Sequence, residues 1–390
     1  MAQTLKNLQN IAEFDLFPVF NNQIGYAPSP FIEKIQKVTL KDPGISANTP
    51  VGANGGVGYG SESAAIPESG AQMYERFKIA PVDLYGNLEI SDKALTLGSG
   101  DSSINLMIDQ VEGIKNTMSF MMGRSIIAGN GSGIICTVSA STGAAKEFTV
   151  SDTRGLVEGM KIDFYANGGT TPAHAKKRIS SIDRNANKIT VEGDAFNATA
   201  GFITYQGSYK NEILGIEAFF DDTVTSIYGV DKANKSWIKP EVDELASGDI
   251  DAKLRSMVRN SERYKDGKID MMLAGDEAYE VYLNYLKESK LMPVERQHFQ
   301  GGVSAIEVLF GNRKIAFVNE RHVAPNAIVG VDTSSFLLPM TPIGFLKHTD
   351  GSAFQRKDNS SIWQAVIGTY LNLICKKPGA QFKLTGVNLA

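Results

Sequence analysis

Residues 42–75 are the part of the chain that most restricts its possible folds. The stretch reads DPGISANTPVGANGGVGYGSESAAIPESGAQMYE and contains few large aliphatic side chains. A segment of this composition cannot bury enough apolar surface to offset the conformational entropy lost on ordering. A structureless excursion of this length is also uncommon inside a compact domain. We therefore expect residues 42–75 either to be disordered or to be ordered by contacts outside their own domain.

The glycines of this stretch could form a phosphate-binding loop, but their spacing argues against one. A P-loop needs Lys followed by Ser or Thr after its last glycine, whereas Gly60 is followed by Ser61 and Glu62. The dinucleotide-binding fingerprint needs a third glycine three residues after its second, and Ser61 stands at that place after Gly58. The glycines at 129–133 fail the same tests. We expect no nucleotide and no other cofactor.

Composition and charge limit the class of protein. The chain has 390 residues and a formal net charge of -4. Binding nucleic acid through a whole surface needs an excess of basic residues, so the charge argues against that role. The start of the chain lacks a signal-peptide core, and the most apolar run, 365–375, is too short to span a bilayer. We expect a soluble protein made in a cytoplasm, with no membrane partner.

Candidate catalytic and metal-binding residues are few. The four histidines lie at least two dozen residues apart, and the two cysteines do not form a CxxC pair. Lone histidines in loops, such as His322, are expected at the surface. The sequence contains no GxSxG motif, and paired carboxylates such as Asp276 with Glu277 are typical of turns and helix starts. We expect no catalytic residue, no metal ligand and no enzyme activity.

Residues 101–128 give the strongest helix prediction. Apolar side chains recur at steps of three and four residues along one side, which is the period of a helix with one buried face. Asp101 or Ser102 suits the N-cap, and Gly129 suits the residue after the last turn. The predicted buried stripe consists of Ile104, Ile108, Val111, Met118, Met122 and Ile126.

The rest of the chain mixes strands and helices. Residues 133–210 contain six short strand-like runs separated by turn clusters, a pattern typical of a small β-barrel or sandwich inserted as a unit. Residues 213–340 alternate helix and strand, and 341–386 are strand-rich. Residues 32–40 resemble a strand, and 82–90 alternate apolar and polar side chains. The expected fold class is α+β.

The order of these pieces resembles that of major capsid proteins of tailed bacteriophages, which have the HK97-like fold. The family's extended loop, where it returns into its strand, resembles SESAAIPESGAQMYERFKIAPVDLYGNLEISDKAL. Its spine helix is similar to INLMIDQVEGIKNTMSFMMGRSIIAG, and the segment entering its axial domain is similar to KNEILGIEAFFDDTVTSIYGVDKANKSWIKPEV. Its ending resembles GNRKIAFVNERHVAPNAIVGVDTSSFLLPMTPI with the tail YLNLICKKPGAQFKLTGV. No single run is diagnostic, and the resemblance rests on their shared order.

The resemblance implies an HK97-like capsid fold with a small all-β domain inserted in it. The spine helix, 101–128, would support the peripheral domain. The parts implied are an N-terminal arm at 1–45, an extended loop at 46–90, a peripheral domain at 91–132 and 341–390, the inserted β-rich domain at 133–210, and an axial domain at 211–340.

The function that the resemblance implies is mechanical. Hexamers and pentamers of the chain would form an icosahedral shell that encloses packaged double-stranded DNA without sequence-specific binding. The shell would assemble in the cytoplasm of a bacterial host and become part of the virion. A portal and a separate scaffolding protein are expected as partners, because the arm begins almost at Met1 and leaves no room for a scaffolding region. A mildly acidic chain suits a container, since a basic inner wall would retain the DNA.

The extended loop would hold neighbouring subunits together. Some family members join a loop lysine to an asparagine of a neighbour, but residues 42–75 contain no lysine, so a noncovalent grip is expected. The glycines would give the loop the flexibility to reach a neighbour. The expected subunit-interface residues are Gly52, Gly55, Gly56, Gly58, Tyr59, Gly60, Pro67, Tyr74 and Arg76.

Two other functions stay open at this point. An encapsulin shares the fold but encloses cargo enzymes, and the inserted strand-rich region and the glycine-rich loop favour the phage protein over it. A carbohydrate-binding or adhesin-like module would use the strand-rich region 133–210 instead.

Overall fold

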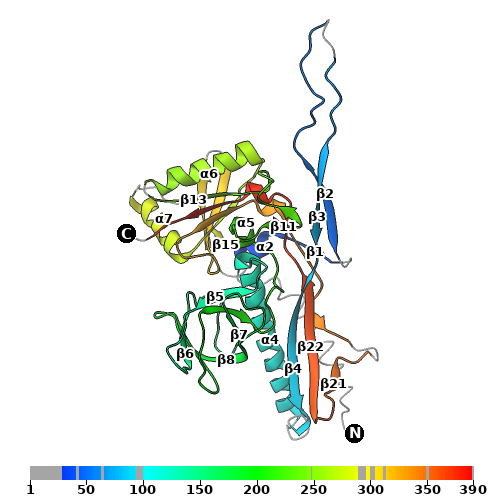
Figure 1. Ribbon diagram of the computed structural model, residues 1–390, viewed down its shortest axis with the longest axis vertical. Helices are drawn as coiled ribbons and strands as arrows, with labels where there is room; N and C mark the ends of the chain where they lie inside the picture. The colour runs from blue at the N-terminus through cyan, green and yellow to red at the C-terminus, as the bar shows by residue number, and fades with distance from the viewer. Residues whose placement is uncertain are drawn as a thin grey trace.

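The computed structural model describes residues 29–40, 44–62, 66–93, 100–246, 248–288, 296–298, 304–310, 313–347 and 351–388. Most of the predicted arm, 1–45, lies outside the described residues, as do the side chains of the predicted caps and of Ile104 and Ile108. Figure 1 shows a projecting hairpin, a central helix beside two long strands, an α/β part at one end of that helix and a β part along its side. In the described ranges no helix is both long and apolar enough to cross a bilayer.

The central helix, α4 (Gly100–Ala128), confirms the helix predicted over 101–128. The Gly129 N–H donates to the Ser125 carbonyl at 3.1 Å, and a Cβ on Gly129 would lie 2.3 Å from that oxygen. Glycine is therefore required where the sequence predicted the helix to end. Within the described part of the predicted stripe, the buried side chains are Val111, Met118, Met122 and Ile126.

A seven-stranded sheet lies beside α4 (Figure 1). Its longest strands, β4 (Val82–Ser91) and β22 (Ile362–Leu371), are antiparallel partners along their whole length. The alternation predicted over 82–90 is confirmed, because Leu88 is buried against the core while Asn87 is exposed. The other strands of this sheet are β1 (Gln36–Thr39), β19 (Phe336–Met340), β20 (Gly344–Phe345), β21 (Phe354–Arg356) and β23 (Ile374–Cys375).

The α/β part contains a second seven-stranded sheet with the order β13-β24-β18-β14-β17-β16-β15. Helices α6 (Ile250–Lys265) and α7 (Asp276–Glu288) bury their apolar faces against it in a hydrophobic cluster of its own. Asp249 caps α6, because its carboxylate accepts a hydrogen bond from the Asp251 N–H at 2.9 Å. The strands are β13 (Glu241–Glu244), β14 (Met271–Ala274), β15 (Arg296–His298), β16 (Ser304–Phe310), β17 (Arg313–Asn319), β18 (Ile328–Val331) and β24 (Phe382–Thr385).

The β part contains the six strands predicted between 133 and 210. They form a six-stranded sheet with the order β5-β10-β7-β8-β9-β6 around a third hydrophobic cluster that includes Phe148, Ile162 and Ile203. The strands are β5 (Ile134–Val138), β6 (Glu147–Thr149), β7 (Lys161–Ala166), β8 (His174–Asp183), β9 (Lys188–Val191) and β10 (Gly201–Tyr205). The short elements α5 (Glu217–Phe220), β11 (Ser226–Ile227) and β12 (Val230–Asp231) connect this part to the α/β part.

The projecting hairpin consists of β2 (Ile45–Val51) and β3 (Met73–Ile79), paired antiparallel from Ile45↔Ile79 to Val51↔Met73. The expectation that 42–75 has no structure of its own is therefore wrong for these strands. Backbone hydrogen bonds form this ladder, and they do not depend on the large aliphatic side chains that the stretch lacks.

The strand predicted over 32–40 is wrong in its first half. Pro30–Lys34 form the short helix α2, and the strand β1 starts only at Gln36. Proline suits the first turn of a helix because its φ is preset and its missing N–H is not needed there. Phe31 and Ile32 are fully buried by this turn, which brings them into the main core.

Candidate functional site

The β2–β3 hairpin is anchored to the body at its base. Phe77 is 3% exposed, and its ring packs edge-on against Tyr228 with the centroids 5.8 Å apart. The Trp237 ring lies on it at 6.0 Å, and Glu75 forms an ion pair with Lys235 next to this contact. The base is therefore held by a buried aromatic cluster and one ion pair.

Sequence reasoning did not find this anchor. Trp237 is partly buried against the main core. Phe77 and Ile79 alternate with Arg76 and Lys78, and this alternation indicates a strand with one buried face. Their partner could not be found from that pattern, because it lies on a loop far along the chain.

The outer part of the hairpin, 52–62 and 66–72, exposes apolar side chains that nothing in the described chain covers. Tyr59 is fully exposed, Ile66 is 90% exposed and Val57 is 86% exposed. Single exposed apolar residues are common on protein surfaces, but several on one projecting segment mark an interaction site. The hairpin is therefore the candidate functional site of this chain.

The structure brings all the predicted interface residues together on this hairpin. Tyr74 and Arg76 lie on β3, where both side chains are exposed. The remaining ones lie in the outer part: Gly52, Gly55, Gly56, Gly58, Tyr59, Gly60 and Pro67.

Two glycines in the outer part are needed because a side chain would not fit at their positions. A Cβ on Gly56 would lie 2.5 Å from the Gly70 nitrogen, and a Cβ on Gly70 would lie 2.3 Å from the Gly56 nitrogen. The Asn54 Oδ1 accepts a hydrogen bond from the Gly56 N–H at 2.9 Å. By contrast, a Cβ on Gly55 or Gly60 would meet open space. Gly70, which the sequence did not single out, is needed because the hairpin brings its backbone against Gly56.

A buried polar cluster lies where α4 meets the loop between β17 and β18. The expectation that His322 is at the surface is wrong, because it is 7% exposed and packs edge-on against Phe120 at 5.5 Å. Its Nε2 accepts a hydrogen bond from the Arg321 Nε at 3.1 Å, and burial together with the arginine charge lowers the pKa of His322 to about 3. The adjacent Glu320 accepts a hydrogen bond from the Ser29 Oγ at 2.7 Å, and burial raises the pKa of Glu320. The His322 ring packs on Phe120 of α4, so this cluster holds the loop against the helix.

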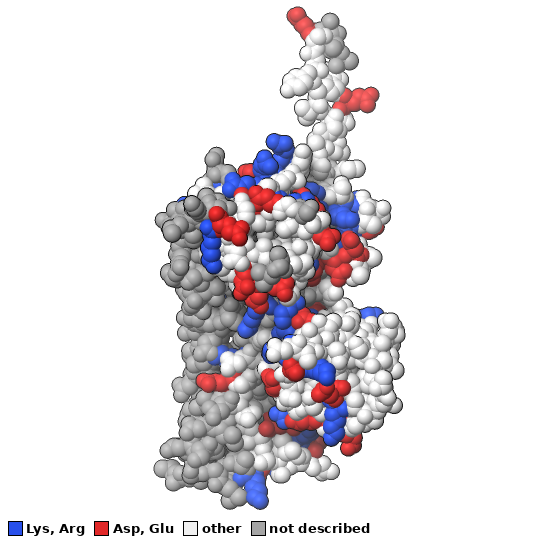
Figure 2. Space-filling view, turned by 90° about the vertical axis from the view of Figure 1, so that its left-hand side faces the viewer, with Lys and Arg blue, Asp and Glu red and all other residues white. Residues whose placement is uncertain are grey.

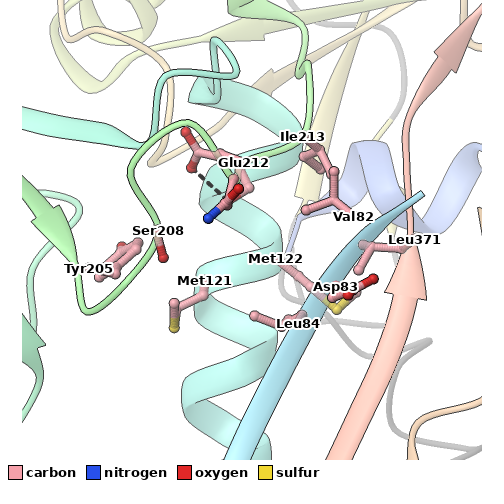
Figure 3. A pocket seen from close by; sticks show the side chains of 12 residues that line it. Val82, Asp83, Leu84, Met121, Met122, Tyr205, Ser208, Glu212, Ile213 and Leu371 are labelled. Atoms are coloured by element: carbon pink, nitrogen blue, oxygen red, sulfur yellow. Dashed lines mark hydrogen bonds between the residues drawn. The ribbon is translucent and has the colours of Figure 1, made fainter. Parts of the chain in front are cut away.

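A small cavity lies between α4, β4 and the chain that leaves the β part (Figure 3). Its volume is about 60 Å³. That is room for a few water molecules, whereas ligand pockets are on the order of 300–1,000 Å³. At its edge Glu212 forms a buried ion pair with Arg124 and accepts a hydrogen bond from the Ser125 Oγ at 2.8 Å. The cavity therefore belongs to the packing between α4 and the chain that leaves the β part.

Metal-binding chemistry has no candidate among the described residues. No three His, Cys, Asp or Glu side chains are grouped there as a metal ion would need.

Comparison with solved structures finds two capsids and an encapsulin. The capsid of cyanophage A-1(L) is 9% identical, with 92% of this chain and 93% of that chain covered and a TM-score of 0.52. The capsid of a native GTA particle is 10% identical over 93% of this chain and 90% of that chain, with a TM-score of 0.49. The SrpI encapsulin of Synechococcus elongatus is 9% identical over 93% of this chain and 89% of that chain, with a TM-score of 0.48. No family model and no curated protein matches the sequence. The likeness to the cyanophage capsid shows a shared fold and confirms the HK97-like α+β fold expected from the sequence, without testing the inserted all-β domain.

Proposed function

We propose that this chain, which has the HK97-like capsid fold, is the major capsid protein of a tailed bacteriophage. Copies of it assemble into an icosahedral shell around packaged double-stranded DNA. One observation carries the proposal: the hairpin projects from the body and exposes Val57, Tyr59 and Ile66 with no cover in the described chain. In a single copy these apolar side chains would stay exposed to water, whereas neighbouring copies in a shell would cover them.

We assign the parts of the fold from the arrangement of its helices and sheets. We narrow the extended loop, expected at 46–90, to the hairpin from Ile45 to Ile79, because β4 pairs with β22 in the central sheet. With α4, that sheet forms the peripheral domain. The sheet with α6 and α7 belongs to the axial domain, and it includes β24, which the sequence analysis assigned to the peripheral domain. The β part is a domain inserted between α4 and the axial domain. Its own hydrophobic cluster supports this, as do its adjacent ends, where the Lys210 N–H donates to the Ser132 carbonyl at 2.8 Å.

The partners follow from this role. Hexamers and pentamers of the chain form the shell, a portal and a separate scaffolding protein take part in assembly in the bacterial cytoplasm, and the finished shell is part of the virion. The shell has no catalytic activity and encloses its DNA without reading its sequence. The formal net charge of -4 supports a container that does not hold its contents tightly.

The test is to purify the full chain after expression in bacteria and image it by cryo-electron microscopy. Closed icosahedral particles, together with DNA packaging in an infected host, would support the proposal. Small cages filled with a protein cargo would instead make the chain an encapsulin. A chain that stays monomeric at high concentration, alone and with its scaffold, would overturn the proposal. Specific glycan binding by such a monomer would favour a carbohydrate-binding module.

A further inference from the structure

Charge is segregated along the hairpin. Between residues 44 and 72 the charged residues are Glu62 and Glu68, both exposed and near the end of the hairpin, which we call the tip. Figure 2 shows this outer part with acidic groups and no basic ones. Basic side chains begin at the base of the hairpin with Arg76 and Lys78. The hairpin is therefore acidic at its tip and carries exposed basic side chains at its base.

The two basic side chains share one face of β3. Successive side chains of a strand point to opposite faces, so Tyr74, Arg76 and Lys78 face away from the side that buries Phe77. We call these three side chains the outer face. The Arg76 Nη2 donates to the Ser46 Oγ at 3.2 Å, which holds the guanidinium over the ladder. Among the described residues, no carboxylate forms an ion pair with Arg76 or Lys78.

The tip cannot neutralise the outer face of its own hairpin. Glu68 and Arg76 are eight residues apart along an extended segment, a separation of roughly 26 Å at about 3.3 Å per residue. This is far beyond the Debye length of about 8 Å at physiological ionic strength. The hairpin is straight in Figure 1, so its tip points away from its base. The carboxylates of the tip can therefore meet Arg76 and Lys78 only on another copy.

We infer that the tip of one copy docks on the outer face of another copy's hairpin base. This inference rests on the proposed function, because it requires neighbouring copies. Glu62 and Glu68 would pair with Arg76 and Lys78, and Tyr59 and Ile66 would pack against Tyr74, which is 65% exposed. The contact joins two different surfaces of the same chain, so it is heterologous and closes into rings when repeated around an axis. Such complementary charges contribute more to the specificity of the contact than to its affinity.

The test reverses the charges on each side. One variant carries Arg76→Glu and Lys78→Glu, a second carries Glu62→Lys and Glu68→Lys, and a third carries all four changes. Each two-site variant should stay folded by far-UV circular dichroism but raise the concentration needed for assembly about tenfold or more, since attraction becomes repulsion. The four-site variant should assemble near the wild-type concentration. The matched control is Arg263→Glu, an exposed arginine on α6, which should assemble as wild type.

Mixing the two-site variants tests whether the contact lies between copies. Each fails alone, but in an equal mixture every tip meets a base of opposite charge, so alternating rings with an even number of copies should form. Sedimentation velocity and negative-stain microscopy would detect them. Assembly of the two-site variants at the wild-type concentration, or a four-site variant and a mixture no better than either parent, would overturn the inference. Those outcomes leave wild-type shells intact, whereas failure of the wild-type chain to form shells would count against the proposed function itself.

Discussion

Arg124 near the end of α4 forms a buried ion pair with Glu212, which lies on the chain returning from the β part. The Arg124 Nη2 also donates to the Ile134 carbonyl at 2.6 Å, on the chain that enters the β part. One guanidinium on the central helix therefore binds both connections of the β part. This arrangement holds the β part in a fixed position beside the helix.

Replacing Glu212 with Ala should destabilise the chain strongly. Arg124 would remain buried without its counter-ion, and breaking a buried pair in this way costs about 3–5 kcal/mol. Urea denaturation of the soluble chain measures the loss. The double variant Arg124→Met with Glu212→Leu should recover most of the stability, because no buried charge remains. Equal losses in the single and double variants would contradict this account.

Phe77 and Tyr59 should respond differently to truncation, although both are aromatic residues of the same hairpin. Phe77→Ala removes the buried anchor and should lower the free energy of unfolding by about 3–5 kcal/mol. Tyr59→Ala removes a fully exposed side chain, so it should leave the unfolding free energy unchanged and weaken assembly. Parallel denaturation and light-scattering measurements separate the two effects. A loss of monomer stability in Tyr59→Ala would show that the tip packs on its own body.

Gly56 and Gly60 form a matched pair for testing the outer part of the hairpin. Gly56→Ala places a methyl group 2.5 Å from the Gly70 nitrogen, whereas Gly60→Ala meets open space. Gly56→Ala should therefore distort the tip and reduce shell yield, while its thermal midpoint stays close to wild type. Gly60→Ala should assemble normally. If both variants assemble alike, the close approach of Gly56 and Gly70 has no role in assembly.

Acid should destabilise the wild-type chain more than a His322→Gln variant. Burial, with the nearby charges of Arg321, Arg124 and Arg154, lowers the folded-state pKa of His322 to about 3, below its ordinary value of 6.5. The neutral ring is therefore favoured by folding, and the stability it contributes is present above pH 6.5 and lost as the pH falls toward 3. Between pH 7 and pH 4 the wild-type chain should lose on the order of 1–3 kcal/mol more than the variant. Urea curves at several pH values would show this, and parallel pH profiles would contradict it. Glu320, whose raised pKa acts in the opposite direction, is present in both proteins.

Replacing residues 133–210 with a short Gly-Ser linker should leave the flanking parts folded. The ends of this segment are adjacent, since the Lys210 N–H donates to the Ser132 carbonyl at 2.8 Å. Arg124 loses the Ile134 carbonyl, so a loss of about 1–3 kcal/mol is expected. Limited proteolysis and circular dichroism would detect unfolding, which would show that the β part is integral to the fold. Folded subunits that form no shells would show that the β part guides assembly.

The elements with strong local periodicity were predictable from sequence. The helix over 101–128 has apolar residues at helical spacing and a glycine at its end, and β4 has strict alternation, so both were placed correctly. The helical turn at Pro30–Lys34 was missed because one turn is too short to show a period. His322 was placed wrongly because its burial comes from Phe120 and Gly123 on a helix far along the chain.

By itself, the sequence determined the α+β class of the fold and the composition of the candidate site. A stretch with few large aliphatic residues cannot form a core of its own, and the absence of lysine in residues 42–75 predicts that any contact they make with a neighbour is noncovalent. The tertiary structure decided that this stretch is a paired hairpin, that Phe77 meets Trp237 at its base, and that Gly56 meets Gly70 near its tip. Those contacts join residues that strand register and distant loops bring together. Local sequence patterns cannot predict such pairs, because the two partners of each contact lie far apart in the sequence and meet only in the folded chain.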